Sequence, residues 1–161
     1  MKSLSNLQAW WSSLAAMVVI FGALLSDIRY NVVTMLELEF APTQESFFAT
    51  IKDSGYTKPF LEKCIYIDYG FIVAFTSVFY FSFIILRAKY KDFFFYRRSF
   101  MFFPGLLDVV ENTIMLHMVR HGEVGELTYN LQMIIVYSKW VLVIPCSILA
   151  IRVLYKVAGN K

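Results

Sequence analysis

Three polar side chains interrupt an apolar stretch of this sequence, PGLLDVVENTIMLHMVR at residues 104–120. Asp108, Glu111 and Asn112 stand near its middle, and helical spacing places them on one face together with Met115. The stretch is apolar enough to cross a bilayer, where a carboxylate at the centre costs roughly 2.5–3.5 kcal/mol on insertion scales. The sequence therefore predicts polar partners for these residues on neighbouring helices.

Two further charged residues stand inside apolar stretches and are candidates for these partners. Lys139 lies on a stripe with Gln132 and Cys146 at seven-residue spacing, and Asp68 lies in an earlier apolar block. At a rise of about 1.5 Å per residue, Glu111 and Lys139 lie roughly 16 Å from an end of their helices, and Asp68 roughly 13 Å. In a hydrocarbon core about 30 Å thick, these depths predict a single layer near the midplane.

Two kinds of site fit three acids and one lysine in one layer. In a structural polar core, Lys139 pairs with one carboxylate and Asn112 satisfies another. In a functional pocket, the surplus of acids over lysine leaves capacity for a proton, a cation or an amine, and ionisable residues within membrane spans often mark such sites. Both readings use the same candidate residues, which are Asp68, Asp108, Glu111, Asn112 and Lys139.

The composition predicts the helices that must position these residues. Of 161 residues, 58% are hydrophobic and 17% are charged, whereas soluble domains average about 45–50% and about 25%. The apolar residues form blocks long enough to cross a bilayer as helices. We therefore predict an all-α, four-helix transmembrane bundle that forms a single domain over residues 1–161, with spans at about 7–28, 60–86, 100–119 and 129–155.

The segment between the first two spans predicts a short amphipathic helix at residues 43–54. Thr43 is a suitable N-cap, Gly55 a suitable terminator, and Phe47 and Phe48 begin an apolar side that Ile51 continues. Such a helix either lies on the membrane surface or folds over the mouth of the bundle.

Charge and aromatic residues predict the orientation. The loop at residues 87–98 holds five basic residues and one acid, Asp92, and a short loop of this kind is typically cytoplasmic. With four spans, both termini then lie in the cytoplasm, and the protein is a multi-pass protein of the cell (inner) membrane. Trp10 and Trp11 are predicted to anchor the first span at the membrane interface.

Several function classes have no support in the sequence. It contains no H-E-x-x-H, no G-x-S-x-G, no phosphate-binding glycine loop and no C-x-x-C. His117 and His121 share a helix face, but a zinc site needs a third ligand, and only Glu123 or Glu126 is near in sequence. A net charge of +3 is too small to indicate nucleic acid as a partner. We expect no metal and no cofactor.

Four segments of the chain resemble a family of small uncharacterised bacterial four-span membrane proteins. These segments are LEFAPTQESFF, IDYGFIVAF, LDVVENTIML and YSKWVLV. The resemblance covers most of the chain and implies that an acid in span two, D-x-x-E-N in span three and Lys-Trp in span four belong together as a set. In this sequence the set is Asp68, Asp108, Glu111, Asn112, Lys139 and Trp140. The resemblance implies no activity.

The sequence favours a non-enzymatic membrane protein that is surrounded by lipid. It would bind a small amphiphile or serve as an accessory subunit of a larger membrane complex. The alternative is an intramembrane enzyme in which Asp108 and Glu111 act as acid and base on a lipidic or isoprenoid substrate. A proton- or cation-coupled carrier is a weaker alternative, because the halves of the chain do not look like inverted copies.

Overall fold

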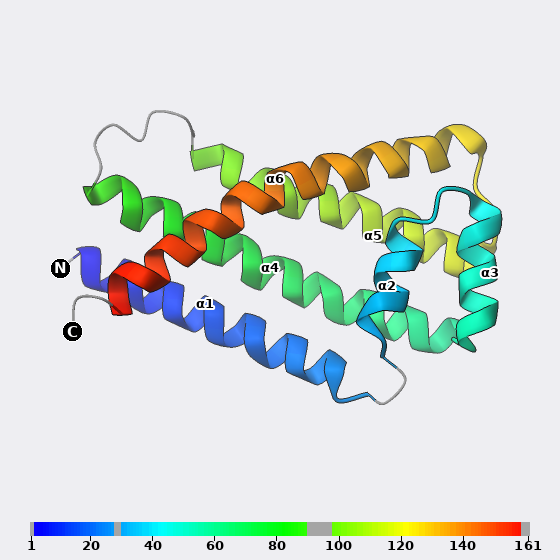
Figure 1. The fold of residues 1–161 in the computed structure, drawn as a ribbon, viewed down its shortest axis with the longest axis horizontal. Helices are drawn as coiled ribbons and strands as arrows, with labels where there is room; N and C mark the ends of the chain where they lie inside the picture. Colours follow the sequence, from blue (N-terminus) through cyan, green and yellow to red (C-terminus); the bar gives the residue numbers. More distant parts are fainter. Residues whose placement is uncertain (1, 28–29, 90–97, 159–161) are drawn as a thin grey trace.

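Four long helices lie lengthwise beside one another and form the body of the protein (Figure 1). The computed structural model describes residues 2–27, 30–89 and 98–158, and all regular structure in these ranges is helical. The long helices are α1 (Lys2–Leu25), α4 (Lys58–Lys89), α5 (Phe103–His121) and α6 (Glu126–Ala158). The shorter elements are α2 (Val32–Glu39), α3 (Gln44–Ser54) and the 3-10 helix η1 (Arg98–Phe102).

Three of the long helices are long and apolar enough to cross a membrane. The apolar stretches are Ser5–Leu25 in α1, Lys58–Ala88 in α4 and Glu126–Tyr155 in α6. α5 is not among them, because Asp108, Glu111 and Arg120 fall within its 19 residues. The prediction of an all-helical chain is confirmed for the described residues, and three helices, rather than the four predicted, are long and apolar enough to cross a membrane.

α4 is the central helix of this arrangement. It packs against α1, α5 and α6, and α5 also packs against α6. Trp10 on α1 is completely buried, and its indole Nε1 donates a hydrogen bond to Ser82 Oγ on α4 at 2.7 Å. The prediction that Trp10 is an interfacial anchor is therefore wrong, because Ser82 satisfies the indole N–H inside the bundle. Trp11 is 44% exposed.

The amphipathic helix predicted at residues 43–54 is confirmed as α3. The side chain of Thr43 accepts a hydrogen bond from the backbone N–H of Ser46, and Ser46 Oγ accepts one from the backbone N–H of Thr43, which forms a capping box. Gly55 ends the helix with φ +69°, a left-handed conformation in which a side chain would be strained.

α3 folds over the end of the bundle. Phe47 is completely buried, in a cluster that includes Met118 of α5 and Tyr129 of α6. The side-chain amide of Gln44 donates to the carbonyl of Val124 at 2.8 Å and accepts from its N–H at 2.9 Å. Of the two predicted positions for this helix, the described contacts place it over the mouth of the bundle.

α2 is a helix that the sequence did not predict. Asn31 caps it, because its Oδ1 accepts a hydrogen bond from the N–H of Val33 at 2.9 Å. Leu38 is buried whereas Val33 and Leu36 are exposed, so α2 turns only one side towards the bundle. Its last residue, Glu39, thereby reaches α6.

Candidate functional site

One face of α6 supplies the only ammonium group of the candidate site within the described residues. Gln132, Lys139 and Cys146 are 1%, 6% and 1% exposed, so the stripe predicted from seven-residue spacing faces the interior. The helix continues through Pro145 and changes direction along its length (Figure 1). Lys139 is therefore held inside the bundle, close to the middle of α6.

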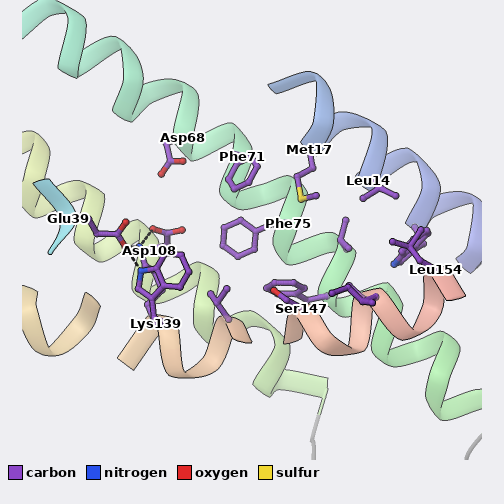
Figure 2. Close-up of a pocket in the computed structure, with 17 residues that line it drawn as sticks. Leu14, Met17, Glu39, Asp68, Phe71, Phe75, Asp108, Lys139, Ser147 and Leu154 are labelled. Carbon is purple, nitrogen blue, oxygen red and sulfur yellow. Dashed lines mark hydrogen bonds and ion pairs between the residues drawn. The ribbon is translucent and has the colours of Figure 1, made fainter. Parts of the chain in front are cut away.

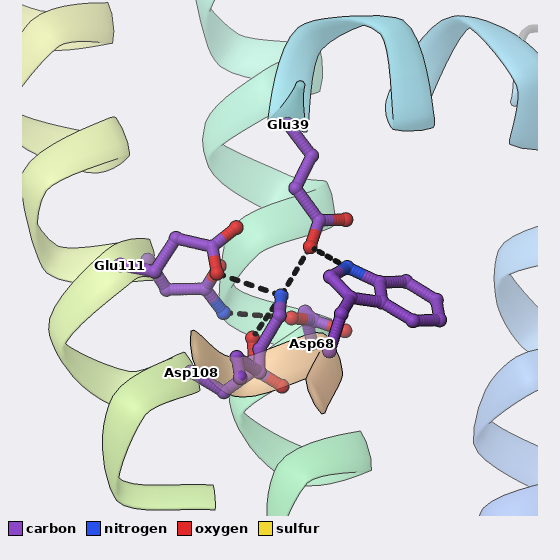
Figure 3. A network of polar contacts seen from close by, with 7 residues as sticks. Glu39, Asp68, Asp108 and Glu111 are labelled. Atoms are coloured by element: carbon purple, nitrogen blue, oxygen red, sulfur yellow. Dashed lines mark hydrogen bonds and ion pairs between the residues drawn. The ribbon is translucent and has the colours of Figure 1, made fainter. Parts of the chain in front are cut away.

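Three carboxylates surround the Lys139 ammonium (Figure 3). Its Nζ lies 3.0 Å from Asp108 Oδ1 and 2.7 Å from Glu111 Oε2, both on α5. The third partner is Glu39 Oε1, from the end of α2. Asp108 and Glu111 are buried, as predicted for a shared face of α5. The contacts offset charges that would be costly to leave alone in a low-dielectric interior.

Two further hydrogen bonds extend these contacts. The side chain of Asn112 on α5 donates to Asp68 Oδ2 on α4 at 2.7 Å, and the indole of Trp140 donates to Glu39 Oε1 at 2.7 Å. Asp68 is thus held through Asn112 and has no ion pair with Lys139. We call the group the Lys139 network, and its members are Glu39, Asp68, Asp108, Glu111, Asn112, Lys139 and Trp140.

The Lys139 network contains more hydrogen-bond acceptors than donors. Within the described residues, the second carboxylate oxygens of Glu39, Asp68 and Asp108 accept no hydrogen bond. Glu111 Oε2 lies close to the ammonium but outside hydrogen-bond geometry, so it forms an ion pair without a hydrogen bond. Four carboxyl groups therefore share one lysine, and several of their oxygens remain available.

A cavity of about 450 Å³ begins at the Lys139 network and runs between α1, α4 and α6. Figure 2 shows Glu39, Asp108 and Lys139 at one end of this main cavity and Leu14 and Leu154 towards the other. Most of the wall is apolar or aromatic. It includes Trp10, Leu14, Met17, Phe71, Phe75, Phe79, Val143 and Ile151.

A smaller cavity of about 120 Å³ also borders the network. It shares four network members with the main cavity and adds Tyr30, Cys64 and Met115. A water molecule takes about 30 Å³ in the liquid, so this polar space is large enough for a few waters. Tyr30 lies between α1 and α2, where burial and then the Asp68 carboxylate raise its pKa to about 12. Its phenol is therefore neutral at ordinary pH.

The structure places the other sequence candidates away from this site. His117 and His121 stack with ring centroids 4.7 Å apart near the end of α5. Within residues 2–27, 30–89 and 98–158, no three His, Cys, Asp or Glu side chains gather as they would around a metal ion.

Sequence reasoning missed Glu39. Glu39 was not among the candidate site residues, although it stands between Leu38, which is buried, and Phe40, whose ring lies 6.0 Å from that of Trp140 between centroids. An acid between two apolar residues, eight positions after the cap Asn31, was the available signal.

The fold and the site define a small helical protein with three helices long and apolar enough to cross a membrane, a buried lysine and a cavity that is polar at one end. Comparisons of the chain with protein-family models, with curated proteins and with solved structures found no match.

Proposed function

We propose that this chain is a four-span protein of the cell (inner) membrane that binds a small amphiphile without converting it. The polar head of the amphiphile lies against the Lys139 network and its apolar tail lies in the main cavity. One observation carries the proposal, namely that a mostly apolar cavity ends at Glu39, Asp68, Asp108 and Lys139. Ligand sites typically combine apolar walls with a few convergent polar groups in about 300–1,000 Å³.

The contacts of α5 support a fourth crossing. Asp108 and Glu111, which lower the apolarity of this helix, are 8% and 1% exposed and face Lys139 rather than lipid. Arg120 lies at the end of the helix, where it pairs with Glu62 Oε2 at 2.9 Å. The polar groups of α5 are thus paired, as intramembrane charges usually are. This topology agrees with the resemblance to bacterial four-span proteins.

The charge distribution supports cytoplasmic termini. The start of α1 and the end of α6 lie at one end of the protein, together with the end of α4 (Figure 1). The cations at this end are Lys2, Arg87, Lys89, Arg152 and Lys156, and those at the other end, among the described residues, are Lys52, Lys58, Lys63 and Arg120. By the positive-inside rule the first end is cytoplasmic. Most of the basic loop predicted at residues 87–98 lies outside the described residues, which omit 90–97.

The position of the main cavity suits a ligand that arrives from the membrane. Ile151 and Leu154 line the cavity and are also exposed. In a membrane-crossing helix, exposed apolar residues face lipid, so an amphiphile can reach the cavity from the bilayer with its tail already in an apolar environment.

Filling the main cavity should remove the amphiphile. Val143 lines the cavity and Val141, two residues earlier on α6, is 69% exposed and does not line it. We expect Val143→Trp to lower the amount of co-purified amphiphile at least tenfold, as measured by native mass spectrometry in mild detergent, because the indole takes the space of the tail. Val141→Trp is the matched control and should retain the wild-type amount.

Two results would contradict the proposal. One is a wild-type protein that carries no amphiphile beyond bulk lipid. The other is a Val143→Trp variant that folds and retains as much amphiphile as Val141→Trp.

The positions of two carboxyl groups keep an enzymatic function as the second candidate. Asp108 lines both cavities whereas Glu111 lines only the smaller one, although both contact Lys139. Carboxyl groups in different environments can act as general acid and general base, and each role typically raises a reaction rate about 10²–10⁴-fold.

The enzymatic candidate predicts that the wild type converts its co-purified amphiphile and that Asp108→Asn and Glu111→Gln each slow the conversion at least 100-fold. The measurement is mass spectrometry of the lipid extract over time, with Asp53→Asn on α3 as the control. If both variants keep full activity, or if the wild type converts nothing, the protein is not an enzyme of this kind.

A further inference from the structure

We propose that the amphiphile has a primary ammonium head, so that the site selects single-chain amines over alcohols and carboxylic acids of the same length. This inference rests on the proposed binding function and names the chemistry of the ligand. The observation that carries it is the shortage of hydrogen-bond donors where the main cavity meets the Lys139 network.

The carboxylates that line the main cavity have oxygens that can still accept hydrogen bonds. Glu39, Asp68 and Asp108 each use one oxygen in the described contacts, and each has a second oxygen that accepts no hydrogen bond. A primary ammonium carries three N–H donors and a positive charge. Hydrogen bonds between charged partners are roughly twice as strong as neutral ones, so this head group fits the wall better than a hydroxyl does.

The lysine does not supply a site for an anion. Lys139 has three N–H donors and is surrounded by three carboxylates, from Glu39, Asp108 and Glu111. A carboxylate or phosphate head would have to compete with these three acids for the ammonium, and it would lie against the remaining carboxylates. Repulsion between like charges is strong in a site shielded from water, so anionic amphiphiles should be excluded.

A second observation points the same way. Glu111 is 1% exposed, borders the smaller cavity and shares the Lys139 ammonium with Glu39 and Asp108. The shortage of cations therefore extends behind Lys139. The Lys139 network has four carboxyl groups and one ammonium, so a bound ligand with a positive charge would reduce the excess of acidic groups over cations.

The apolar tail cannot provide the selectivity. A tail that moves from lipid into the main cavity exchanges one apolar environment for another and gains little from the hydrophobic effect. Contacts at the polar end therefore decide which amphiphile binds. Trp140 and Phe71 lie on the wall of the cavity, and their ring faces also favour a cation.

The test compares head groups on one chain length. The full-length protein is placed in nanodiscs of zwitterionic phosphatidylcholine at pH 7, and binding of tritiated dodecylamine is measured by scintillation proximity. Unlabelled dodecylamine, dodecanol, dodecanoate and dodecyltrimethylammonium are the competitors. We expect dodecylamine to compete at least tenfold better than dodecanol and dodecyltrimethylammonium, which lack the charge and the donors respectively, and dodecanoate not to compete.

Variants identify the groups that recognise the amine. Asp68→Asn should weaken dodecylamine binding at least tenfold, whereas Asp53→Asn, an acid on α3 away from both cavities, should leave it unchanged. If Asp68→Asn does not fold, Glu39→Gln provides the same test from α2, outside the long helices.

The possible failures are distinct. If dodecanol or dodecanoate binds as tightly as dodecylamine, or if neither folded variant weakens amine binding, the head-group inference is wrong and amphiphile binding stands. If none of the four compounds binds, and Val143→Trp leaves the co-purified material unchanged, both the inference and the proposed function fail.

Discussion

Replacing Lys139 with methionine is expected to remove most of the folded protein. The change keeps an unbranched apolar side chain of similar length but deletes the charge that faces Glu39, Asp108 and Glu111. Breaking a buried ion pair by removing one partner typically costs about 3–5 kcal/mol, because the remaining charge is left buried and uncompensated. Here one lysine pairs with three acids, so we expect the loss of stability to lie at the upper end of this range.

Size-exclusion chromatography of the detergent-solubilised protein after stepwise heating measures this effect. Lys63→Met is the matched control. Lys63 pairs with Asp27 Oδ2 at 3.2 Å, but its side chain is 57% exposed, and an exposed pair contributes only about 0–1 kcal/mol.

A rescue experiment separates loss of charge from loss of packing. Adding Glu111→Gln and Asp108→Asn to Lys139→Met removes two of the uncompensated carboxylates, and we expect the triple variant to recover part of the lost stability. A Lys139→Met protein as heat-resistant as Lys63→Met would show that the ion pairs do not hold the helices together.

The long helices could be predicted because the signal for them is local. Each apolar block is long enough to cross a bilayer, and residues three, four or seven apart on a helix share a face whatever surrounds it. This is why the buried positions of Asp108, Glu111 and Lys139 followed from spacing alone. The cap and terminator of α3 were predictable for the same reason, since Thr43 and Gly55 act on their immediate neighbours.

Glu39 could not be predicted because its role depends on contacts distant in sequence. α2 is only eight residues long, too short for a periodic pattern, and isolated helices of that length are unstable in water. Its position follows from Phe40 against Trp140 and from the Tyr129 hydroxyl, which donates to the carbonyl of Ala41 at 2.7 Å. Both partners belong to α6, about 90–100 positions further along the chain.

Trp10 shows a similar limit. A tryptophan near the end of an apolar block is usually interfacial, and only the position of Ser82, 72 residues away, provides a buried partner for its indole. The main cavity was equally inaccessible from sequence, because its walls come from five helices whose relative positions no single segment determines.

A close approach between α4 and α5 leads to the other large expected effect. Gly105 lies in the first turn of α5, and a Cβ placed on it would collide with Oγ1 of Thr76 on α4. The same Cβ would lie 3.4 Å from Ile72 Cγ2, so there is little free space beside the collision. Small residues commonly allow such close helix approach in membranes. We expect Gly105→Ala to destabilise the protein by about 2–3 kcal/mol, the upper range for overpacking in a core.

The same heating assay tests this prediction, and two further variants make it specific. Gly22→Ala is the control, because a Cβ on Gly22 of α1 meets nothing within 4 Å, and alanine favours a helix over glycine by about 0.5–1 kcal/mol.

Thr76→Ala should rescue Gly105→Ala, since it removes the colliding hydroxyl, which is buried and has no hydrogen-bond partner among the described residues. The two substitutions should therefore be strongly non-additive. Equal stability of Gly105→Ala and Gly22→Ala would mean that α5 can move away from α4 at little cost. The helix that carries Asp108 and Glu111 would then not be held in place by the contact at Gly105.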